Sequence, residues 1–274
     1  MAECEVPYMG WNLLAIFFVI SLVVCLVGFY KYVYFLSIGY GFAVSGIGIG
    51  MAVMMLTGVL PASLPMFIFC ALYLIYGIRL SGFLLIREIK NASYRKTLKE
   101  ATGEESAMPI FVKVAIWICT SILYVAQTSP VFFRAYNGKE TTALIWVGIV
   151  ISIFGICLEA LADQQKTEQK KAEPNKVAMK GLYKIVRCPN YFGEILFWTG
   201  VFVASLDALN SVGQWVMAII GYICIVFIMF NGAQRLEKRQ MARYGNDKEY
   251  NDYANKTPII IPLLPIYHLN KVEK

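Results

Sequence analysis

The sequence predicts an all-α, polytopic membrane protein with about seven transmembrane helices. Of its 274 residues, 58% are hydrophobic and only 16% are charged, whereas about one quarter of the residues of a soluble domain are charged. The mean hydropathy is +0.58, and the apolar residues fall into runs of roughly 20, a length that crosses a bilayer. This composition excludes a soluble domain, a disordered chain, collagen and a coiled coil.

The apolar runs give the predicted helices in order. The first covers about residues 11–30 and lacks a basic leader, so we expect a membrane helix rather than a cleaved signal peptide. The second extends to about Leu60, and its closely spaced glycines, from Gly39 to Gly50, allow neighbouring backbones to approach. The remaining spans are predicted at about residues 66–86, 110–129, 142–162, 191–206 and 212–232. The span at 191–206 is short, and we expect it to be tilted or partly re-entrant.

Basic residues gather in three segments of a chain whose net charge is +7. The segment at 87–99 carries five lysines and arginines, the segment at 166–187 seven, and the part from Arg235 onward eight. The turns at 61–65 and 207–213 carry none, and the predicted loop at 130–141 carries Arg134 and Lys139. The positive-inside rule therefore predicts an outside N-terminus and a cytoplasmic C-terminal tail. We expect a multi-pass protein of a bacterial inner membrane or the endoplasmic reticulum.

Cysteine and histidine usage argues against metal chemistry. The seven cysteines form no C-x-x-C pair, and His268 is the single histidine. We interpret the cysteines as small apolar side chains and predict no metal site. Any catalysis then depends on Tyr, Glu, Asp or Lys side chains, or on a cofactor.

A charged face extends the fifth predicted helix. Steps of four, three and four residues place two acids and two bases on one side of a helix: Glu159, Asp163, Lys166 and Lys170. One interpretation is a set of solvated salt bridges where the helix leaves the membrane. The other is a ligand site, in which the acids bind hydroxyl or amide groups and the lysines bind phosphates.

A second candidate lies between residues 181 and 194. Pro189 suits the first position of a helix, so Asn190 is expected near the N-terminus of the sixth span. Glu194 follows one turn later in an apolar stretch, where a carboxylate is costly without a partner. Glu194 is therefore a candidate site residue, or else a partner of the helix dipole with Asn190 as the cap.

A tyrosine and two arginines share one side of the third predicted helix. Tyr76 lies one turn from Arg79, and Arg79 lies about 12 Å deeper in the membrane than Arg87 at the rise of an α-helix. We favour a buried anionic partner for Arg79, and snorkelling of its side chain is the alternative.

The end of the seventh helix continues into a basic segment with interleaved tyrosines. Its charged and aromatic residues include Arg235, Glu237, Arg243, Tyr244 and Tyr253. Such a segment binds lipid headgroups, or it forms a folded cytoplasmic cap, which the tyrosines and the helix-ending Gly245 favour.

Taken together, these motifs resemble those of the steroid 5-alpha-reductase family and its relatives, the delta-14 and delta-7 sterol reductases. The likeness is best over residues 158–274, in the order Asp163-x-x-Lys166, Arg187-x-Pro189-Asn190-Tyr191-x-Gly193-Glu194, Arg235-x-Glu237 and Arg243-Tyr244-Gly245. Tyr76 and Arg79 match a shorter motif. We therefore divide the chain into N-terminal helices of unclear role at 1–60 and a reductase-like membrane domain at 61–274.

The resemblance implies that cytoplasmic loops bind NADPH. The cofactor-binding residues that it implies are Arg79, Asp163, Lys166, Lys170, Arg187, Asn190, Tyr191, Glu194, Arg235, Glu237, Arg243, Tyr244 and Tyr253. The resemblance also implies that Tyr76 is the catalytic acid facing the substrate ketone. Those reductases pair this tyrosine with a glutamate of the second helix, whereas no acidic residue lies between Glu5 and Glu88 here. Tyr76 would then act alone, with the loop, or with a bound water.

The function that this resemblance implies is reduction of an activated C=C bond in a 3-oxo-delta-4 steroid or a related lipid enone. Hydride would reach the beta carbon while Tyr76 stabilises the developing enolate. We expect an apolar steroid-like or lipid substrate, a lipid bilayer around a monomer, and no nucleic acid.

Two other functions stay open. The first is an S-adenosylmethionine-dependent membrane methyltransferase of the isoprenylcysteine carboxyl methyltransferase type, which shares the core Arg187-x-Pro189-x-Tyr191-x-Gly193. Clustered lysines favour a phosphorylated cofactor instead, since S-adenosylmethionine carries no phosphate. The second is a non-catalytic lipid or sterol binder, against which the full polar set from Asp163 to Tyr244 argues.

Overall fold

The described part of the chain contains helices and no strand, which confirms the predicted all-α class. The structure is a computed structural model, and it describes residues 6–90, 95 and 108–270. The chain divides into two compact units. Unit 1 comprises Met1–Ile149 and Val201–Gly221, and unit 2 comprises Val150–Gly200 and Tyr222–Lys274.

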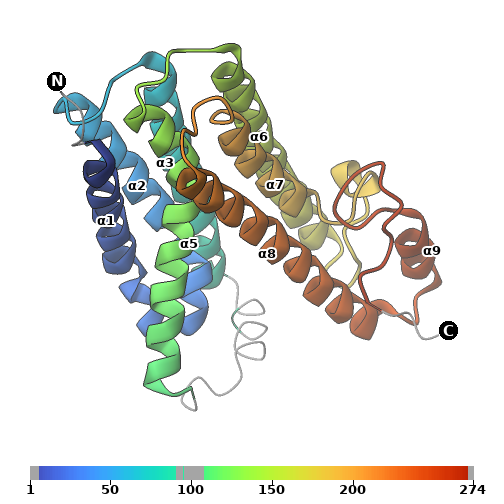
Figure 1. Cartoon of the computed structure of the whole chain (residues 1–274). Helices are drawn as coiled ribbons and strands as arrows, with labels where there is room; N and C mark the ends of the chain where they lie inside the picture. Colours follow the sequence, from blue (N-terminus) through green and yellow to red (C-terminus); the bar gives the residue numbers. More distant parts are fainter. Residues whose placement is uncertain (1–5, 91–94, 96–107, 271–274) are drawn as a thin grey trace, which may run out of the picture. The chain divides into compact units, whose positions relative to one another are not determined.

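Four helices form the bundle of unit 1 (Figure 1). They are α1 (Val6–Cys25), α2 (Ile38–Leu56), α3 (Leu64–Lys90) and α5 (Ile110–Tyr136), and α2 contacts each of the other three. Two short 3₁₀ segments, η1 (Leu26–Phe29) and η2 (Tyr32–Leu36), join α1 to α2. Buried side chains such as Phe17, Phe69 and Phe132 fill the space between these helices.

Glycines of α2 bring its backbone close to its neighbours. A Cβ at Gly50 would lie 3.1 Å from Ile20 of α1, and a Cβ at Gly48 would lie 2.9 Å from Tyr73 of α3. Small residues at such crossings let membrane helices pack closely. The close packing that the glycine spacing predicts is therefore confirmed.

Helix α5 continues past its predicted end at residue 129 and includes Pro130. A proline lacks the N–H that would bond the carbonyl four residues earlier, here that of Ala126. The Ser129 hydroxyl donates to that carbonyl at 2.8 Å instead, and the helix runs on to Tyr136. The predicted loop at 130–141 is therefore wrong in its first half.

Arg134, which the sequence placed in that loop, is a buried side chain with 2% exposure. Its guanidinium donates to the Asp207 carboxylate at 2.6 Å, the Ala204 carbonyl at 2.9 Å and the Thr142 hydroxyl at 3.1 Å. A buried arginine needs this many acceptors because desolvating its charge is costly. These bonds attach the segment at 204–207 to α5 within unit 1.

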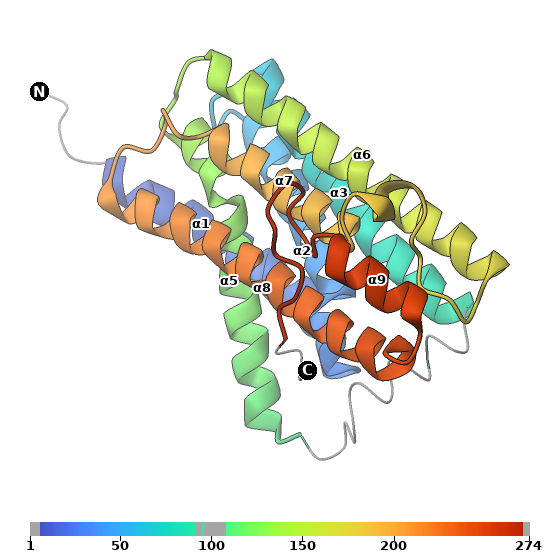
Figure 2. The ribbon, with the colours of Figure 1, turned by 90° about the vertical axis from the view of Figure 1, so that its right-hand side faces the viewer.

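Unit 2 combines parts of three helices with a C-terminal cap. It contains α6 (Ala143–Ala172) from Val150, α7 (Pro189–Val203) up to Gly200, and α8 (Val212–Tyr244) from Tyr222. The loop between α6 and α7 carries η4 (Gly181–Lys184), and α9 (Lys248–Lys256) follows α8. Figure 2 shows α9 beside that loop.

Six helices of the described chain are long and apolar enough to cross a membrane, namely α1, α2, α3, α5, α6 and α8. The sixth predicted span, at 191–206, corresponds to α7, which has 15 residues. At the rise of an α-helix this is about 22 Å, less than the ~30 Å hydrocarbon core. The chain is thus an integral membrane protein with six candidate spans, and α7 is too short to cross alone.

The basic segments coincide mostly with helix ends rather than loops. Arg87 and Lys90 lie in the last turn of α3, and Lys170 and Lys171 in the last turn of α6. Lys96 and Lys99 lie outside the described residues. Charged, straight-chain residues have good helix propensity, so they continue a membrane helix into water.

Candidate functional site

The charged face predicted beyond the fifth span is part of one continuous helix, α6. Near its end, Lys170 donates to the Tyr244 hydroxyl at 3.0 Å and to the Pro174 carbonyl at 3.3 Å. The Lys170 ammonium also lies 5.3 Å from the centre of the Tyr244 ring, a cation–π distance. Lys170 and Tyr244, both predicted cofactor residues, are thus brought together.

Two other residues of this face, Asp163 and Lys166, affect the pKa values of side chains in the loop between α6 and α7. Burial raises the pKa of the Cys188 thiol to about 12, and the charge of Lys166 opposes that increase. Burial also raises the pKa of Tyr183, and the charge of Asp163 adds to the effect. Cys188 is therefore an unreactive buried thiol, and both charged side chains lie close enough to the loop to affect it electrostatically.

Two glutamines that the sequence analysis did not single out fix this loop to α6. The Gln165 side-chain oxygen accepts from the backbone N–H of Leu182 at 2.9 Å. The Gln169 oxygen accepts from the N–H groups of Met179 and Lys180 at 3.0 and 2.8 Å. The four-residue spacing of the glutamines, which puts both on one helix face, is the signal that could have identified them.

At the α6–α7 crossing, Glu159 of α6 lies against Gly193 of α7, the residue before Glu194. A Cβ at Gly155 would lie 2.6 Å from the Gly193 carbonyl, and a Cβ at Gly193 would lie 2.8 Å from the backbone nitrogen of Glu159. Only glycine permits this approach. Glu159 and Glu194 are buried, at 3% and 6% exposure, so both carboxylates require polar surroundings.

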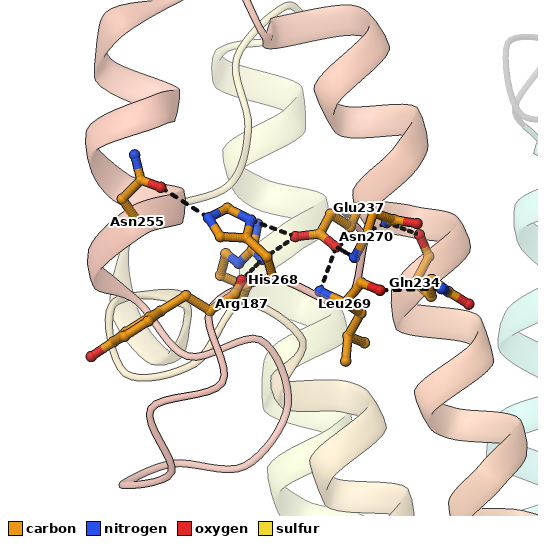
Figure 3. Close-up of polar contacts among 8 residues, drawn as sticks. Arg187, Gln234, Glu237, Asn255, His268, Leu269 and Asn270 are labelled. Carbon is orange, nitrogen blue, oxygen red and sulfur yellow. Dashed lines mark hydrogen bonds and ion pairs between the residues drawn. The ribbon is translucent and has the colours of Figure 1, made fainter. Parts of the chain in front are cut away.

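Arg187 and Glu237 form a buried ion pair with a 2.7 Å separation, and their side chains are 2% and 0% exposed (Figure 3). Arg187 also donates to the Tyr267 carbonyl. Its backbone N–H donates to the Pro258 carbonyl at 2.8 Å, and that of Cys188 donates to the Ile259 carbonyl at 2.9 Å. These two predicted cofactor residues therefore bind each other and the tail.

His268, the single histidine of the sequence, belongs to the same network. Its Nδ1 lies 2.9 Å from a Glu237 oxygen, and its Nε2 lies 2.9 Å from the Asn255 side-chain oxygen (Figure 3). The other Glu237 oxygen accepts from the backbone N–H groups of Leu269 and Asn270 at 2.9 and 3.0 Å. No local pattern reveals this contact, because 31 residues separate Glu237 from His268.

The start of α7 faces the basic end of α8. A Cβ at Gly232 would lie 3.3 Å from the Tyr191 ring. Burial raises the pKa of Tyr191, the charge of Glu194 adds to the effect, and Arg235 and Arg239 oppose it. Tyr191, Glu194 and Arg235 are predicted cofactor residues, and Arg239 joins them.

Three exposed arginines, Arg235, Arg239 and Arg243, follow one another at four-residue steps along α8. Such spacing puts their guanidinium groups on one face of the helix, where they can bind phosphates in bidentate fashion. Arg243 also donates to the Asn175 side-chain oxygen at 3.3 Å. Arg239 was missed in the sequence analysis, although its spacing could have revealed it.

The remaining predicted residues fall in two places. Tyr253 of α9 donates to the Tyr183 carbonyl at 2.6 Å, and Asn190 lies in the first turn of α7, which begins at Pro189 as expected. Tyr76 and Arg79 lie on α3, in unit 1. Tyr76 is fully buried and donates to the Tyr40 hydroxyl of α2 at 2.9 Å.

An open apolar groove of about 510 Å³ runs along α8. The side chains that line it are Tyr222, Ile223, Val226, Phe227 and Phe230. The Tyr222 hydroxyl lies 2.9 Å from the Thr199 hydroxyl of α7. This lining suits a lipid chain or another apolar molecule.

Comparison with known proteins identifies the family. The sequence profile of DUF1295, described as a protein of unknown function, matches residues 40–257, more than half of the chain. The chain belongs to the DUF1295 family. The matched region includes Tyr40, Tyr76 and every predicted cofactor residue of unit 2.

Two curated proteins are similar to this DUF1295 chain. Steroid 5-alpha-reductase DET2 of Gossypium hirsutum is 25% identical over 132 residues, which are 46% of each chain. An uncharacterized protein of Schizosaccharomyces pombe is 25% identical over 188 residues, which are 60% of this chain and 53% of that protein. The chain spans about half the length of these relatives. No solved structure matches it. The predicted resemblance to the steroid 5-alpha-reductase family is thus confirmed.

Proposed function

We propose that this protein is a membrane-embedded, NADPH-dependent reductase of an activated C=C bond in a 3-oxo-delta-4 steroid or a related lipid enone. The observation that carries the proposal is the similarity to a steroid 5-alpha-reductase. The arrangement of unit 2 supports it, since exposed cationic side chains gather beside a loop docked through many hydrogen bonds.

The donor set of unit 2 fits a phosphorylated cofactor. Arg235, Arg239 and Arg243 present three guanidinium groups on one helix face, and such groups match the geometry of phosphate oxygens. Bound NADPH would supply the hydride. In this proposal the three arginines bind its phosphates. The Asp163 carboxylate accepts hydrogen bonds from its polar groups, and the Asn190 amide donates hydrogen bonds to them.

The buried pair Arg187 and Glu237 receives a different role from the one that the family resemblance implies. Both side chains are inaccessible, and Glu237 holds the backbone of Leu269 and Asn270. We assign them the role of fixing the C-terminal tail against α8. Tyr253 fixes the loop between α6 and α7 in a similar way, because its hydroxyl donates to the Tyr183 carbonyl.

Tyr76 keeps its proposed role as the acid at the substrate carbonyl. Its hydroxyl is buried in the apolar bundle of unit 1, and a donor in such a low-dielectric place stabilises developing negative charge more strongly than in water. An apolar surrounding also excludes water from the developing enolate.

The proposed orientation places the basic ends of α3, α6 and α8 in the cytoplasm, where NADPH is available. It requires α7 and the turn after it to return the chain to the other side before α8 begins, which the bonds of Arg134 to both Ala204 and Thr142 support. The positive-inside rule supports this orientation, because the last turns of α3, α6 and α8 carry Arg87 and Lys90, Lys170 and Lys171, and Arg243. The membrane is that of a bacterium or the endoplasmic reticulum.

Calorimetry of the full chain in detergent separates the reductase from the methyltransferase alternative. The proposal predicts binding of NADPH and no binding of S-adenosylhomocysteine, whereas the reverse result would establish the methyltransferase. Turnover is then measured with NADPH and testosterone by loss of nicotinamide absorbance. Tyr76→Phe should lower turnover and leave NADPH binding intact, while a variant that loses NADPH binding would contradict the role of Tyr76.

A further inference from the structure

Tyr76 has a hydroxyl partner in the second helix of the bundle. The Tyr76 oxygen lies 2.9 Å from the Tyr40 oxygen, and the two side chains are 0% and 5% exposed. Both rings are in edge contact, with centroids 6.0 Å apart at an angle of 77°. The sequence contains no acidic residue near this position, so a second phenol stands beside the proposed acid.

The backbone geometry that brings these phenols together is specific. Each tyrosine precedes a glycine, and these two glycines meet where the helices cross: a Cβ at Gly77 would lie 1.9 Å from the Gly41 carbonyl oxygen. A Cβ at Gly41 would in turn lie 2.6 Å from the Gly77 carbonyl oxygen. Only residues without a Cβ fit both positions. The crossing therefore holds Tyr40 and Tyr76 in one register.

Hydrogen bonds lock the crossing on both sides of the tyrosine pair. The Ser81 hydroxyl of α3 donates to the Ile38 carbonyl of α2 at 2.7 Å. The Ser45 hydroxyl of α2 donates to the Leu74 carbonyl of α3 at 3.2 Å. Because serine bonds bracket the pair, the two hydroxyls cannot slide apart without breaking one of them.

A third tyrosine fixes the ring of Tyr40. The Tyr124 ring of α5 lies 4.9 Å from the Tyr40 ring at an angle of 33°, and the Tyr124 hydroxyl donates to the Phe35 carbonyl. Tyr40 is thus held by packing on one side and by the Tyr76 hydroxyl on the other.

We propose that Tyr40 is a positioning residue for Tyr76 in the reaction, an inference that rests on the proposed reductase function. A phenol can donate one hydrogen bond and accept another. When Tyr40 donates to the Tyr76 oxygen, the Tyr76 proton points at the substrate carbonyl rather than at Tyr40. The two hydroxyls then form a chain in which each bond polarises the next, so Tyr76 becomes a stronger donor.

The test compares Tyr40→Phe with Tyr73→Phe for reduction of testosterone by NADPH. Tyr73 is the matched control, since it is also a fully buried tyrosine, on α3, whose hydroxyl lies 3.5 Å from a backbone carbonyl. Tyr40→Phe should lower kcat by about 10- to 100-fold, somewhat less than loss of a donor that contacts the reacting oxygen. KM and NADPH affinity should stay unchanged, and Tyr73→Phe should keep kcat within about threefold.

A double variant shows whether Tyr40 acts through Tyr76. If it does, Tyr40→Phe should have little further effect in a Tyr76→Phe background, whereas independent roles give multiplied losses. As a second probe that keeps the shape and the hydroxyl, 3-fluorotyrosine at position 40 should shift the alkaline limb of the kcat–pH profile to lower pH. A purely structural tyrosine would leave that profile in place.

The outcomes separate the inference from the proposed function. A wild-type protein that reduces no enone contradicts the function, and the inference with it. An active wild-type protein whose Tyr40→Phe variant matches Tyr73→Phe contradicts the inference alone, as does an unshifted pH profile with 3-fluorotyrosine. If Tyr40→Phe does not fold, the 3-fluorotyrosine profile decides.

Discussion

Replacing Glu237 by glutamine should release the C-terminal tail from α8. The carboxylate faces Arg187 at 2.7 Å and His268 at 2.9 Å, and it accepts from the Leu269 and Asn270 N–H groups at 2.9 and 3.0 Å. Glutamine keeps the shape of the side chain but removes its charge and one acceptor. Arg187, which is 2% exposed, would remain as a buried cation without its counterion.

Removing one partner of a buried ion pair costs about 3–5 kcal/mol, because the other charge stays desolvated. At 1.4 kcal/mol per factor of ten, this cost raises the opening equilibrium of the tail by about 10²- to 4 × 10³-fold. The amides of Leu269, Asn270 and Ile259, all hydrogen-bonded in the closed state, should therefore exchange faster by that factor.

Hydrogen exchange of the full chain in detergent, followed by mass spectrometry of the 258–270 peptides, measures this change. The control is Glu249→Gln, since Glu249 is 61% exposed and its ion pair with Lys176 is 3.5 Å long. A surface pair of this kind contributes at most about 1 kcal/mol, so the control should change exchange by fivefold or less. Equal exchange of the tail in both variants would refute the assignment of Glu237 to the tail.

Three further outcomes are expected. Gly77→Ala should destabilise the protein by more than about 3 kcal/mol in thermal unfolding, because the added Cβ would lie 1.9 Å from a backbone oxygen of α2. The control Gly82→Ala, on the same helix, places its Cβ in open space and should leave thermal unfolding unchanged. Arg239→Gln should weaken NADPH binding about tenfold and lessen its salt dependence in calorimetry; unchanged affinity would remove Arg239 from the site. Burial raises the pKa of Asp207, but hydrogen bonds from Thr142 and Arg134 outweigh that effect and hold the pKa below the ordinary value of an aspartate. The carboxylate therefore stabilises the fold at pH values above its unfolded pKa and loses that effect as the pH falls through the lower folded value. Asp207→Asn should flatten the acid limb of the thermal-stability profile, and an unchanged limb would contradict this role.

Much of the fold follows from hydropathy alone. Long apolar runs fix the positions of the membrane helices, because each must satisfy its backbone hydrogen bonds internally. Their ends are harder to predict: α5 passes through Pro130 because the Ser129 hydroxyl satisfies the Ala126 carbonyl. Because a loop was predicted there, the burial of Arg134 was not expected, and its partner Asp207 lies 73 residues away in the sequence.

The candidate site shows the same division. The family resemblance predicted Lys170, Tyr244, Tyr191 and Arg235 as site residues. The structure brings Lys170 to Tyr244, and the charge of Arg235 acts on Tyr191. Spacing could not show that Arg187 and Glu237, 50 residues apart, bind each other. It also could not reveal the Tyr40–Tyr76 pair, since a helix crossing is a property of two segments and neither contains it alone.

The measurement that tests the central claim most directly is transfer of deuterium from NADPH labelled at C4 of the nicotinamide to a lipid enone. Purified protein is incubated with each C4-labelled epimer and testosterone, and the steroid is analysed by mass spectrometry. The account predicts a saturated ketone that carries one deuterium at the beta carbon with one epimer, and far less label with Tyr76→Phe. A panel of enones that yields no labelled product, from a protein that is folded and binds NADPH, would contradict it.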